Sequence, residues 1–393
     1  MTINYLLNSS LDFNPDRRAS RYAAIYFGVL GPAVFIVQPG FVQSLVSEMN
    51  FSEAQAGYVA SAEMWGIAVA TLLLTIGARY VNWQRVLFFS VLVTALGNGV
   101  SVMPEGPASF AGVRFITGLG SGTMISLSFT AIGLSRDSDR NFGFMIMWIL
   151  IYGAIGFACM PAIVNIFGLD ALLLFWAAFN LSGLAVLRFM PAQPADTQQN
   201  PIKTTGLAWY AISALFFYFL AQGVVWAYLF LIGVNGGLGE ETVAWGLTIS
   251  QLLGITGAVC AATLANRYGR LMPLQVGILS SIVALLMLLG DLSASLFAIS
   301  VCLFNFAWNK THPFMLALLA DFDNEGRAVQ LGVAAQMLGL ALAPALAAIL
   351  LEGADYAMVI WLGIILFGLS GLFILPPLLR KSVATDAQTP LER

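Results

Sequence analysis

Charged residues are scarce in this chain. Asp, Glu, Lys and Arg together make up 9% of its 393 residues, and there is one histidine. A soluble globule of this size would carry about a quarter charged residues. Apolar residues make up 59% of the chain, and the mean hydropathy is +0.85. This composition excludes an ordinary soluble protein and predicts an all-α integral membrane protein.

Side chains that carry chemistry are also few. The three cysteines, Cys159, Cys260 and Cys302, all lie in apolar runs, and we interpret them as small core residues rather than as a disulfide or metal framework. One histidine and one clear intramembrane acid are too few for a catalytic centre. No G-x-x-x-x-G-K-[ST] phosphate-binding motif occurs. We therefore expect no enzyme activity, no metal and no cofactor, and no mechanism driven by ATP.

Apolar runs of about 20 residues are abundant, and each is long enough to cross roughly 30 Å of hydrocarbon as a helix. No cleavable signal peptide is expected, because residues 1–21 are polar and lack an apolar stretch. Twelve transmembrane helices are predicted, at residues 22–46, 54–77, 85–103, 108–134, 142–167, 170–190, 207–233, 241–265, 271–290, 293–319, 328–351 and 355–378.

The distribution of positive charge predicts the orientation of these helices. Lys and Arg total 17; Arg114 and Lys310 lie well within predicted spans, and the other 15 fall on the two tails, in the loops after spans 2, 4, 6, 8 and 10, or at the span ends that border those loops. Loops rich in Lys and Arg stay in the cytoplasm. Both termini are therefore predicted to be cytoplasmic, with the protein in the inner (plasma) membrane.

The two halves of the chain repeat each other. The loop GARYVNWQR, residues 77–85, is echoed by ATLANRYGR, residues 262–270, and Gln38 in the first span is echoed by Gln222 in the seventh. A polar linker, residues 191–206, lies between the halves. We predict two pseudo-symmetric six-helix bundles with a cytoplasmic tail at each end: tail 1–21, bundle 22–190, bundle 207–379 and tail 380–393.

Two motifs resemble those of the major facilitator superfamily. The loop ATLANRYGR is similar to the family's G-x-L-A-D-R-x-G-R signature, although Asn266 replaces the Asp and Ala262 replaces the first Gly. The segment RFITGLGSG is similar to the family's R-x-x-x-G-x-G-x-G motif, and it contains Arg114, Gly118, Gly120 and Gly122. Together with the repeat, the resemblance covers essentially the whole chain. It implies a secondary transporter whose two halves rock about a central site by alternating access.

The resemblance also implies a cytoplasmic gate, for which the candidates are Arg85, Asn266, Arg267 and Arg270. Asn266 and Val81 stand where the family has acids. The gate should therefore be weaker here, or be rebuilt from acids in other cytoplasmic loops. The alternative is that these arginines only determine topology.

Four ionisable side chains fall within predicted spans: Glu63, Arg114, Lys310 and His312. A charge at the bilayer centre costs at least about 2.5–3.5 kcal/mol, so such residues have a partner or a role. By the resemblance, spans 1, 4, 7 and 10 line the central cavity. The cations outnumber the acid, and surplus positive charge attracts anions. The predicted substrate is a carboxylate-bearing organic anion, and the nearby Trp residues suggest an aromatic one.

The predicted substrate site is centred on NFAWNKTHPF, residues 305–314, where Lys310 would pair with the carboxylate. Asn305 and Asn309 are four residues apart and share a helix face, as do Trp308 and His312. Lys310 lies about 140° around the helix from Asn305. The full set of substrate-binding candidates is Lys310, Asn305, Asn309, Gln38, Gln222, Trp226, Trp308 and Arg114.

Structural explanations remain open for each buried ionisable residue. Arg114 could serve helix packing or coupling, and Lys310 could snorkel towards the interface. His312 precedes Pro313 and could bond a backbone group that a kink releases. Glu63 could be the partner of a neighbouring helix.

Glu63 and then His312 are the candidates to carry a coupling proton, because spans 1 and 7 lack the acids of a sodium site. The Gly-Pro pair that is typical of related drug exporters is absent from span 5 (IYGAIGFACMP), which favours uptake. The alternative is proton-driven efflux of drugs or metabolites. A channel is disfavoured, because a pore needs symmetric rings of ligands. The expected partners are a small molecule, protons and the lipid bilayer; we expect no nucleic acid and a monomer.

Overall fold

The computed structural model describes residues 17–103, 106–136, 138–192, 206–264, 271–322, 327–351 and 355–386. Within these ranges every regular element is a helix and there is no strand. Seven of the described helical segments are long and apolar enough to cross a membrane. The predicted all-α membrane fold is confirmed, and the count of twelve spans remains a prediction.

The first half of the chain begins with a broken helix. It consists of α2 (Arg18–Leu30), α3 (Ala33–Ile36) and α4 (Gln38–Met49), with breaks beside Pro32 and before Pro39. The helices that follow are α5 (Glu53–Gly77), η1 (Ala78–Tyr80), α6 (Trp83–Val100) and α7 (Pro107–Gly133).

Predicted spans 5 and 6 form one continuous element, α8 (Ser138–Leu181), which contains two helices that meet at a kink. The kink is at Gly168, whose φ of 77° lies in the left-handed region that glycine adopts at little cost. The half ends with α9 (Gly183–Val186) and η2 (Leu187–Phe189).

The second half begins with α10 (Gly206–Trp226) and α11 (Leu229–Asn235), which together replace the single predicted span 7. The remaining helices are α12 (Glu240–Leu264), α13 (Leu271–Leu286), α14 (Ala294–Ala320), α15 (Arg327–Leu351) and α16 (Tyr356–Asp386). The last of these continues beyond the predicted end at residue 378.

Two pairs of corresponding helices match in length. α5 and α12 each have 25 residues, and α7 and α14 each have 27. In both pairs the helix of the second half begins and ends 187 residues after its counterpart. This offset equals the spacing of Arg140 and Arg327, so residues 187 apart can be compared as counterparts.

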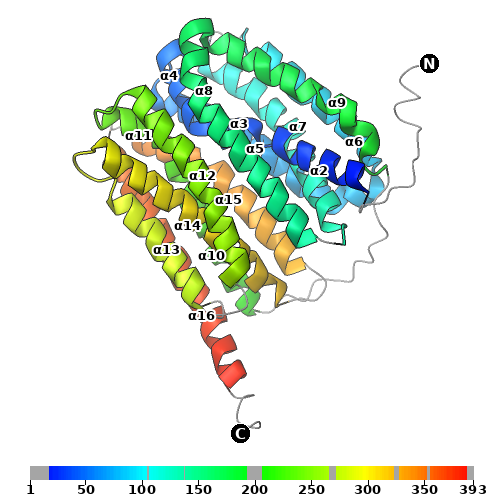
Figure 1. Ribbon diagram of the computed structural model, residues 1–393, viewed down its shortest axis with the longest axis vertical. Helices are drawn as coiled ribbons and strands as arrows, with labels where there is room; N and C mark the ends of the chain where they lie inside the picture. The colour runs from blue at the N-terminus through cyan, green and yellow to red at the C-terminus, as the bar shows by residue number, and fades with distance from the viewer. Residues whose placement is uncertain are drawn as a thin grey trace.

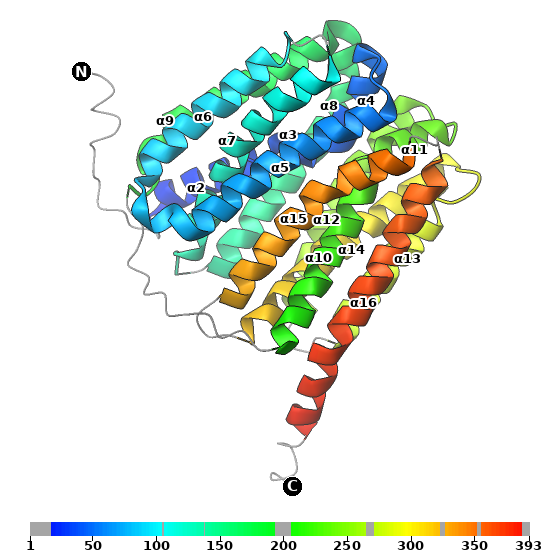
Figure 2. The same ribbon diagram turned by 180° about the vertical axis from the view of Figure 1, so that it is seen from behind.

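The two halves lie closest together at one end of the molecule. In Figures 1 and 2 this is the end with α4 and α11, and the halves diverge towards the end at which α2 begins and α16 ends. We call the end with α4, α11 and the start of α12 the outer end, because the charge distribution predicts that it faces away from the cytoplasm. The opposite end is called the inner end.

The glycines of RFITGLGSG bring α7 into direct contact with two neighbours. A Cβ added at Gly118 would overlap the carbonyl oxygen of Glu63 on α5, and one at Gly122 would overlap that of Ile67. Gly120 faces the other side, where a Cβ would overlap the hydroxyl of Thr94 on α6. The backbones of α5, α6 and α7 therefore approach as closely as small residues allow.

This close packing predicts a selective effect of added methyl groups. Gly118→Ala should destabilise the protein by about 1–3 kcal/mol, the usual cost of overpacking. Gly112, on the same helix, has nothing within 4 Å of an added Cβ, so Gly112→Ala is the matched control and should melt no lower than the parent. Thermal unfolding in detergent tests this, and equal melting of both variants would contradict the packing.

Candidate functional site

Glu63 on α5 and Arg114 on α7 form a buried ion pair. Arg114 donates from Nη2 to Glu63 Oε1 at 2.5 Å and from Nε to Glu63 Oε2 at 3.2 Å. The Arg114 side chain is 0% exposed and that of Glu63 is 3% exposed. A two-pronged bond of this kind lets each charge offset the desolvation of the other.

Three further groups enclose the guanidinium. Arg114 Nη1 donates to Asn98 Oδ1 on α6 at 2.6 Å, and Ser101 Oγ lies 3.5 Å from the same nitrogen. The ring of Phe41 on α4 lies 5.4 Å from the guanidinium carbon. Arg114 therefore sits in the core of the first half, with its guanidinium bonded to a carboxylate on α5. Glu63 is the partner of Arg114 and is not a counter-charge for Lys310.

An aromatic cluster joins the two halves near the middle of the molecule. It comprises Phe35 on α3, Phe157 on α8, Phe219 and Trp226 on α10, and Trp308 on α14. The rings of Trp226 and Trp308 meet edge to face at 5.6 Å. Trp308 also contacts Phe35 and Phe219, and Phe157 contacts Trp226. Trp226 Nε1 donates to the carbonyl oxygen of Phe35 at 3.1 Å, so the cluster has a polar link as well.

His312 extends this cluster towards α15. Its ring meets Phe219 at 4.8 Å, and its Nε2 lies 3.0 Å from Oε1 of Gln336. Both Trp308 and His312 contact Phe219, which confirms that they share a helix face. The described partner of His312 is a side-chain amide rather than a backbone group released at Pro313.

Asn305 and Asn309 form a hydrogen-bonded pair on the face of α14 that meets α12. Asn309 Nδ2 donates to Asn305 Oδ1 at 2.7 Å, and Asn305 Nδ2 donates to Ser250 Oγ at 3.3 Å. Their predicted shared face is therefore confirmed. Ser250 lies 187 residues after Glu63. The second half thus has a neutral hydroxyl where the first half has a carboxylate.

Lys310 is buried without a counter-ion. It is 7% exposed, and it makes no hydrogen bond or ion pair within the described parts of the chain. The thiol of Cys260 on α12 is within electrostatic range of its amine. Most of the side chain is therefore covered by other residues in this conformation.

The remaining substrate-binding candidates, Gln222 and Gln38, are both buried. Gln222 is buried on α10, donates from Nε2 to Tyr218 Oη at 3.2 Å, and has no described partner for its Oε1. Gln38 is buried at the start of α4. Of the expected gate, Arg85 is exposed near the start of α6, and Asn266, Arg267 and Arg270 lie outside the described residues.

Contacts between the halves gather in the outer part of the molecule, among the residues described. Gln43 Nε2 on α4 donates to Glu240 Oε1 on α12 at 2.9 Å, and Tyr228 Oη donates to the carbonyl oxygen of Glu53 at 3.2 Å. Further in, Ser61 Oγ on α5 donates to the carbonyl oxygen of Ala341 on α15 at 2.6 Å. These bonds close the outer end in this conformation.

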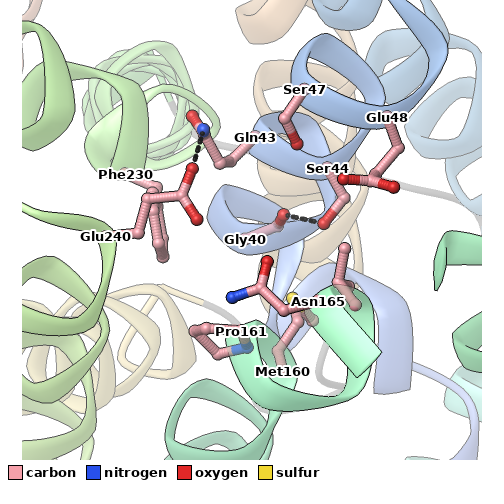
Figure 3. Close-up of a pocket in the computed structure, with 11 residues that line it drawn as sticks. Gly40, Gln43, Ser44, Ser47, Glu48, Met160, Pro161, Asn165, Phe230 and Glu240 are labelled. Carbon is pink, nitrogen blue, oxygen red and sulfur yellow. Dashed lines mark hydrogen bonds between the residues drawn. The ribbon is translucent and has the colours of Figure 1, made fainter. Parts of the chain in front are cut away.

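A small pocket lies beside the Gln43–Glu240 bond (Figure 3). It encloses about 380 Å³ of space that is partly open to solvent, and Ser44, Glu48 and Asn165 contribute polar groups to its wall. Sequence reasoning missed this contact region. Nothing in the local sequence shows which residue would lie opposite Glu48 or Glu240.

Comparisons with known proteins agree with this architecture. The family described as Major Facilitator Superfamily matches residues 23–335. The crystal structure of a D-xylose-proton symporter superposes with a TM-score of 0.74 at 16% sequence identity, covering 91% of this chain and 96% of that chain. The comparison with curated proteins gives no match. At this identity the structural likeness concerns the fold alone.

The buried ion pair predicts a non-additive pattern of stability. Glu63→Gln leaves a buried guanidinium without a carboxylate, and loss of one member of a buried pair costs about 3–5 kcal/mol. The double variant Glu63→Gln/Arg114→Gln removes both charges and should melt above either single variant. A thermal double-mutant cycle measures this. Strictly additive losses would show that the two charges do not depend on each other.

Proposed function

The chain belongs to the major facilitator superfamily, so it is a membrane transporter rather than an enzyme, and from this premise we propose that it carries a small carboxylate-bearing solute into the cell together with protons. The substrate proposal rests on one observation: Lys310 is buried and has no described counter-ion. We further propose that the protein works as a monomer in the inner membrane, with cytoplasmic termini.

The buried charges suggest a division of tasks between the halves. In the first half, Arg114 is already neutralised by Glu63, which leaves it little capacity to bind an anion. In the second half, Lys310 lies next in sequence to Asn309 and two residues from Trp308. A ligand carboxylate would supply the charge that Lys310 lacks, and the amides and indoles would add hydrogen bonds and flat apolar walls. This arrangement supports Lys310 over Arg114 as the anion-binding residue.

The position of Glu63 suggests how a proton could be coupled to movement. When Glu63 is protonated, its ion pair with Arg114 is replaced by a weaker contact between the charged guanidinium and a neutral carboxylic acid. Ser61, two residues earlier on α5, holds α15 of the other half through its bond to Ala341. Glu63 and Ser61 lie within one turn of α5. A change in the contact between Glu63 and α7 can therefore alter the contact between Ser61 and the other half. The similar solved structure is that of a proton symporter, which supports the proton as the coupling ion.

The coupling proposal predicts loss of accumulation without loss of movement. Proteoliposomes that contain the double variant Glu63→Gln/Arg114→Gln should exchange labelled substrate across the membrane but should not concentrate it when a proton gradient is imposed. His312→Gln is the control and should accumulate substrate like the parent. If the double variant also accumulates substrate, the proton passes elsewhere, and His312 becomes the next residue to test.

The substrate proposal is tested by ligand binding to variants of Lys310. A thermal-shift screen of carboxylic acids, sugars and lipophilic cations first identifies a stabilising acid; stabilisation by lipophilic cations alone would favour efflux instead. Lys310→Met keeps an unbranched side chain of nearly the same length and removes its charge. It should weaken binding of the acid by about 1.5–3 kcal/mol, the range for a hydrogen bond to a charged group.

Two comparisons separate loss of binding from loss of folding. Lys310→Met should melt no lower than the parent in the absence of ligand, because it removes a buried amine that has no described counter-ion. Lys310→Arg should recover only part of the affinity, since the guanidinium has a different geometry. Unchanged affinity in Lys310→Met by isothermal titration would rule out Lys310 as the counter-charge.

A further inference from the structure

We propose that Asn98 on α6 is a positioning residue for proton coupling: its amide oxygen holds the Arg114 guanidinium while Glu63 is protonated. This inference rests on the proposed role of Glu63 as the proton carrier. Asn98 is a third partner of the ion pair and lies on a different helix from Glu63 and Arg114. In this proposal, Asn98 determines the pH range in which the transporter takes up its proton.

The geometry divides the guanidinium between two partners. Glu63 accepts from Nε and Nη2, whereas Asn98 Oδ1 accepts from Nη1 at 2.6 Å. The two acceptors therefore do not compete for the same nitrogen. Asn98 is 0% exposed, so water does not provide an easy substitute for its oxygen.

The packing of α6 holds Asn98 at this distance from Arg114. The adjacent residue, Gly97, faces α7 so closely that a Cβ there would overlap the hydroxyl of Thr117. From the other side of the same contact, Gly120 of α7 lies against Thr94 of α6. The last turns of α6 are thus fixed on α7, and Asn98 cannot withdraw without separating the two helices.

The need for such a partner follows from the chemistry of arginine. The guanidinium keeps its positive charge in proteins. When Glu63 takes up a proton, this charge remains in a region from which water is excluded, and it then depends on dipoles for stabilisation. Asn98 offers the same carbonyl oxygen in both states. Arg114 therefore has one partner that changes with pH and one that does not.

Packing alone does not explain why an amide side chain occupies position 98, because a buried amide costs free energy when one of its polar groups has no partner. Its Nδ2 is buried and has no hydrogen-bond partner among the described residues. An apolar side chain of similar size would avoid that unsatisfied donor. The oxygen's bond to Arg114 accounts for the presence of an amide at this position.

No second carboxylate has a described bond to the pair, so a pH response at this site would come from Glu63. The other ionisable side chains on the helices packed against α5 and α7 lie mostly towards the helix ends. At the outer end these are Glu48 and Glu53, with Tyr58 further along α5; towards the inner end they are Arg18, Arg21, Tyr22, Tyr26 and Arg85; and on α8 they are Arg140, Tyr152, Cys159 and Asp170.

The test is the pH dependence of proton-driven uptake in proteoliposomes that contain the full chain. Asn98→Asp gives Arg114 a second carboxylate, so Glu63 should take up its proton at higher pH, and the midpoint of the profile should rise by about one pH unit or more. Asn98→Leu leaves Glu63 as the main partner of Arg114, so the midpoint should fall. Opposite shifts at one position are not expected from a purely structural role.

Two further variants guard against loss of folding. Asn98→Gln keeps a neutral amide oxygen and should keep the midpoint nearer to the parent value than Asn98→Leu does, so this comparison suffices if Asn98→Asp does not fold. Asn180 is a buried asparagine of the same half that donates to the carbonyl oxygen of Trp176. Asn180→Asp should leave the midpoint unchanged.

The outcomes separate this inference from the one on which it rests. If the parent shows no uptake driven by a proton gradient, the proposed function fails. If the parent shows a pH-dependent profile and the Asp and Leu variants at position 98 either keep its midpoint or shift it in the same direction, proton coupling stands and the role of Asn98 is overturned.

Discussion

The cost of burying charge in an apolar interior governs the arrangement of this protein. Glu63 and Arg114 can lie in the core only because each offsets the charge of the other, and because Asn98 completes the bonding of the guanidinium. Such a pair requires three helices to approach closely. The glycines at 118, 120 and 122 allow this by removing side chains from both faces of α7. The glycine motif therefore allows the close helix packing that brings Arg114 and Glu63 together.

The same helices are used differently in the second half. Its counterparts of α5 and α7 have equal lengths and a constant offset, but Ser250 replaces Glu63 and Asn305 replaces Gly118. A neutral hydrogen bond between Asn305 and Ser250 is found where the first half packs the backbone of Glu63 against a glycine. Shared architecture with different chemistry fits a transporter in which one half responds to protons and the other recognises the solute.

In the proposed division of tasks, communication between the two halves depends on the contacts between them. The aromatic cluster joins the halves near the middle, and the bonds of Gln43 and Tyr228 join them at the outer end. Each of these contacts must break if the outer end is to open. Single hydrogen bonds contribute about 0.5–1.5 kcal/mol each, so a few of them can be exchanged within the energy that an ion pair or a bound ligand supplies.

The sequence by itself determined the membrane class, the helical periodicity and the shared faces of Asn305 with Asn309 and of Trp308 with His312, because these depend on composition and on the spacing within one helix. Only the tertiary structure decided that Arg114 pairs with Glu63 and Asn98, that Lys310 has no described counter-ion, and that Gln43 meets Glu240. Helical spacing shows which residues share a face, but it does not show which helix lies opposite. The partner of a buried charge is therefore decided by how the helices pack.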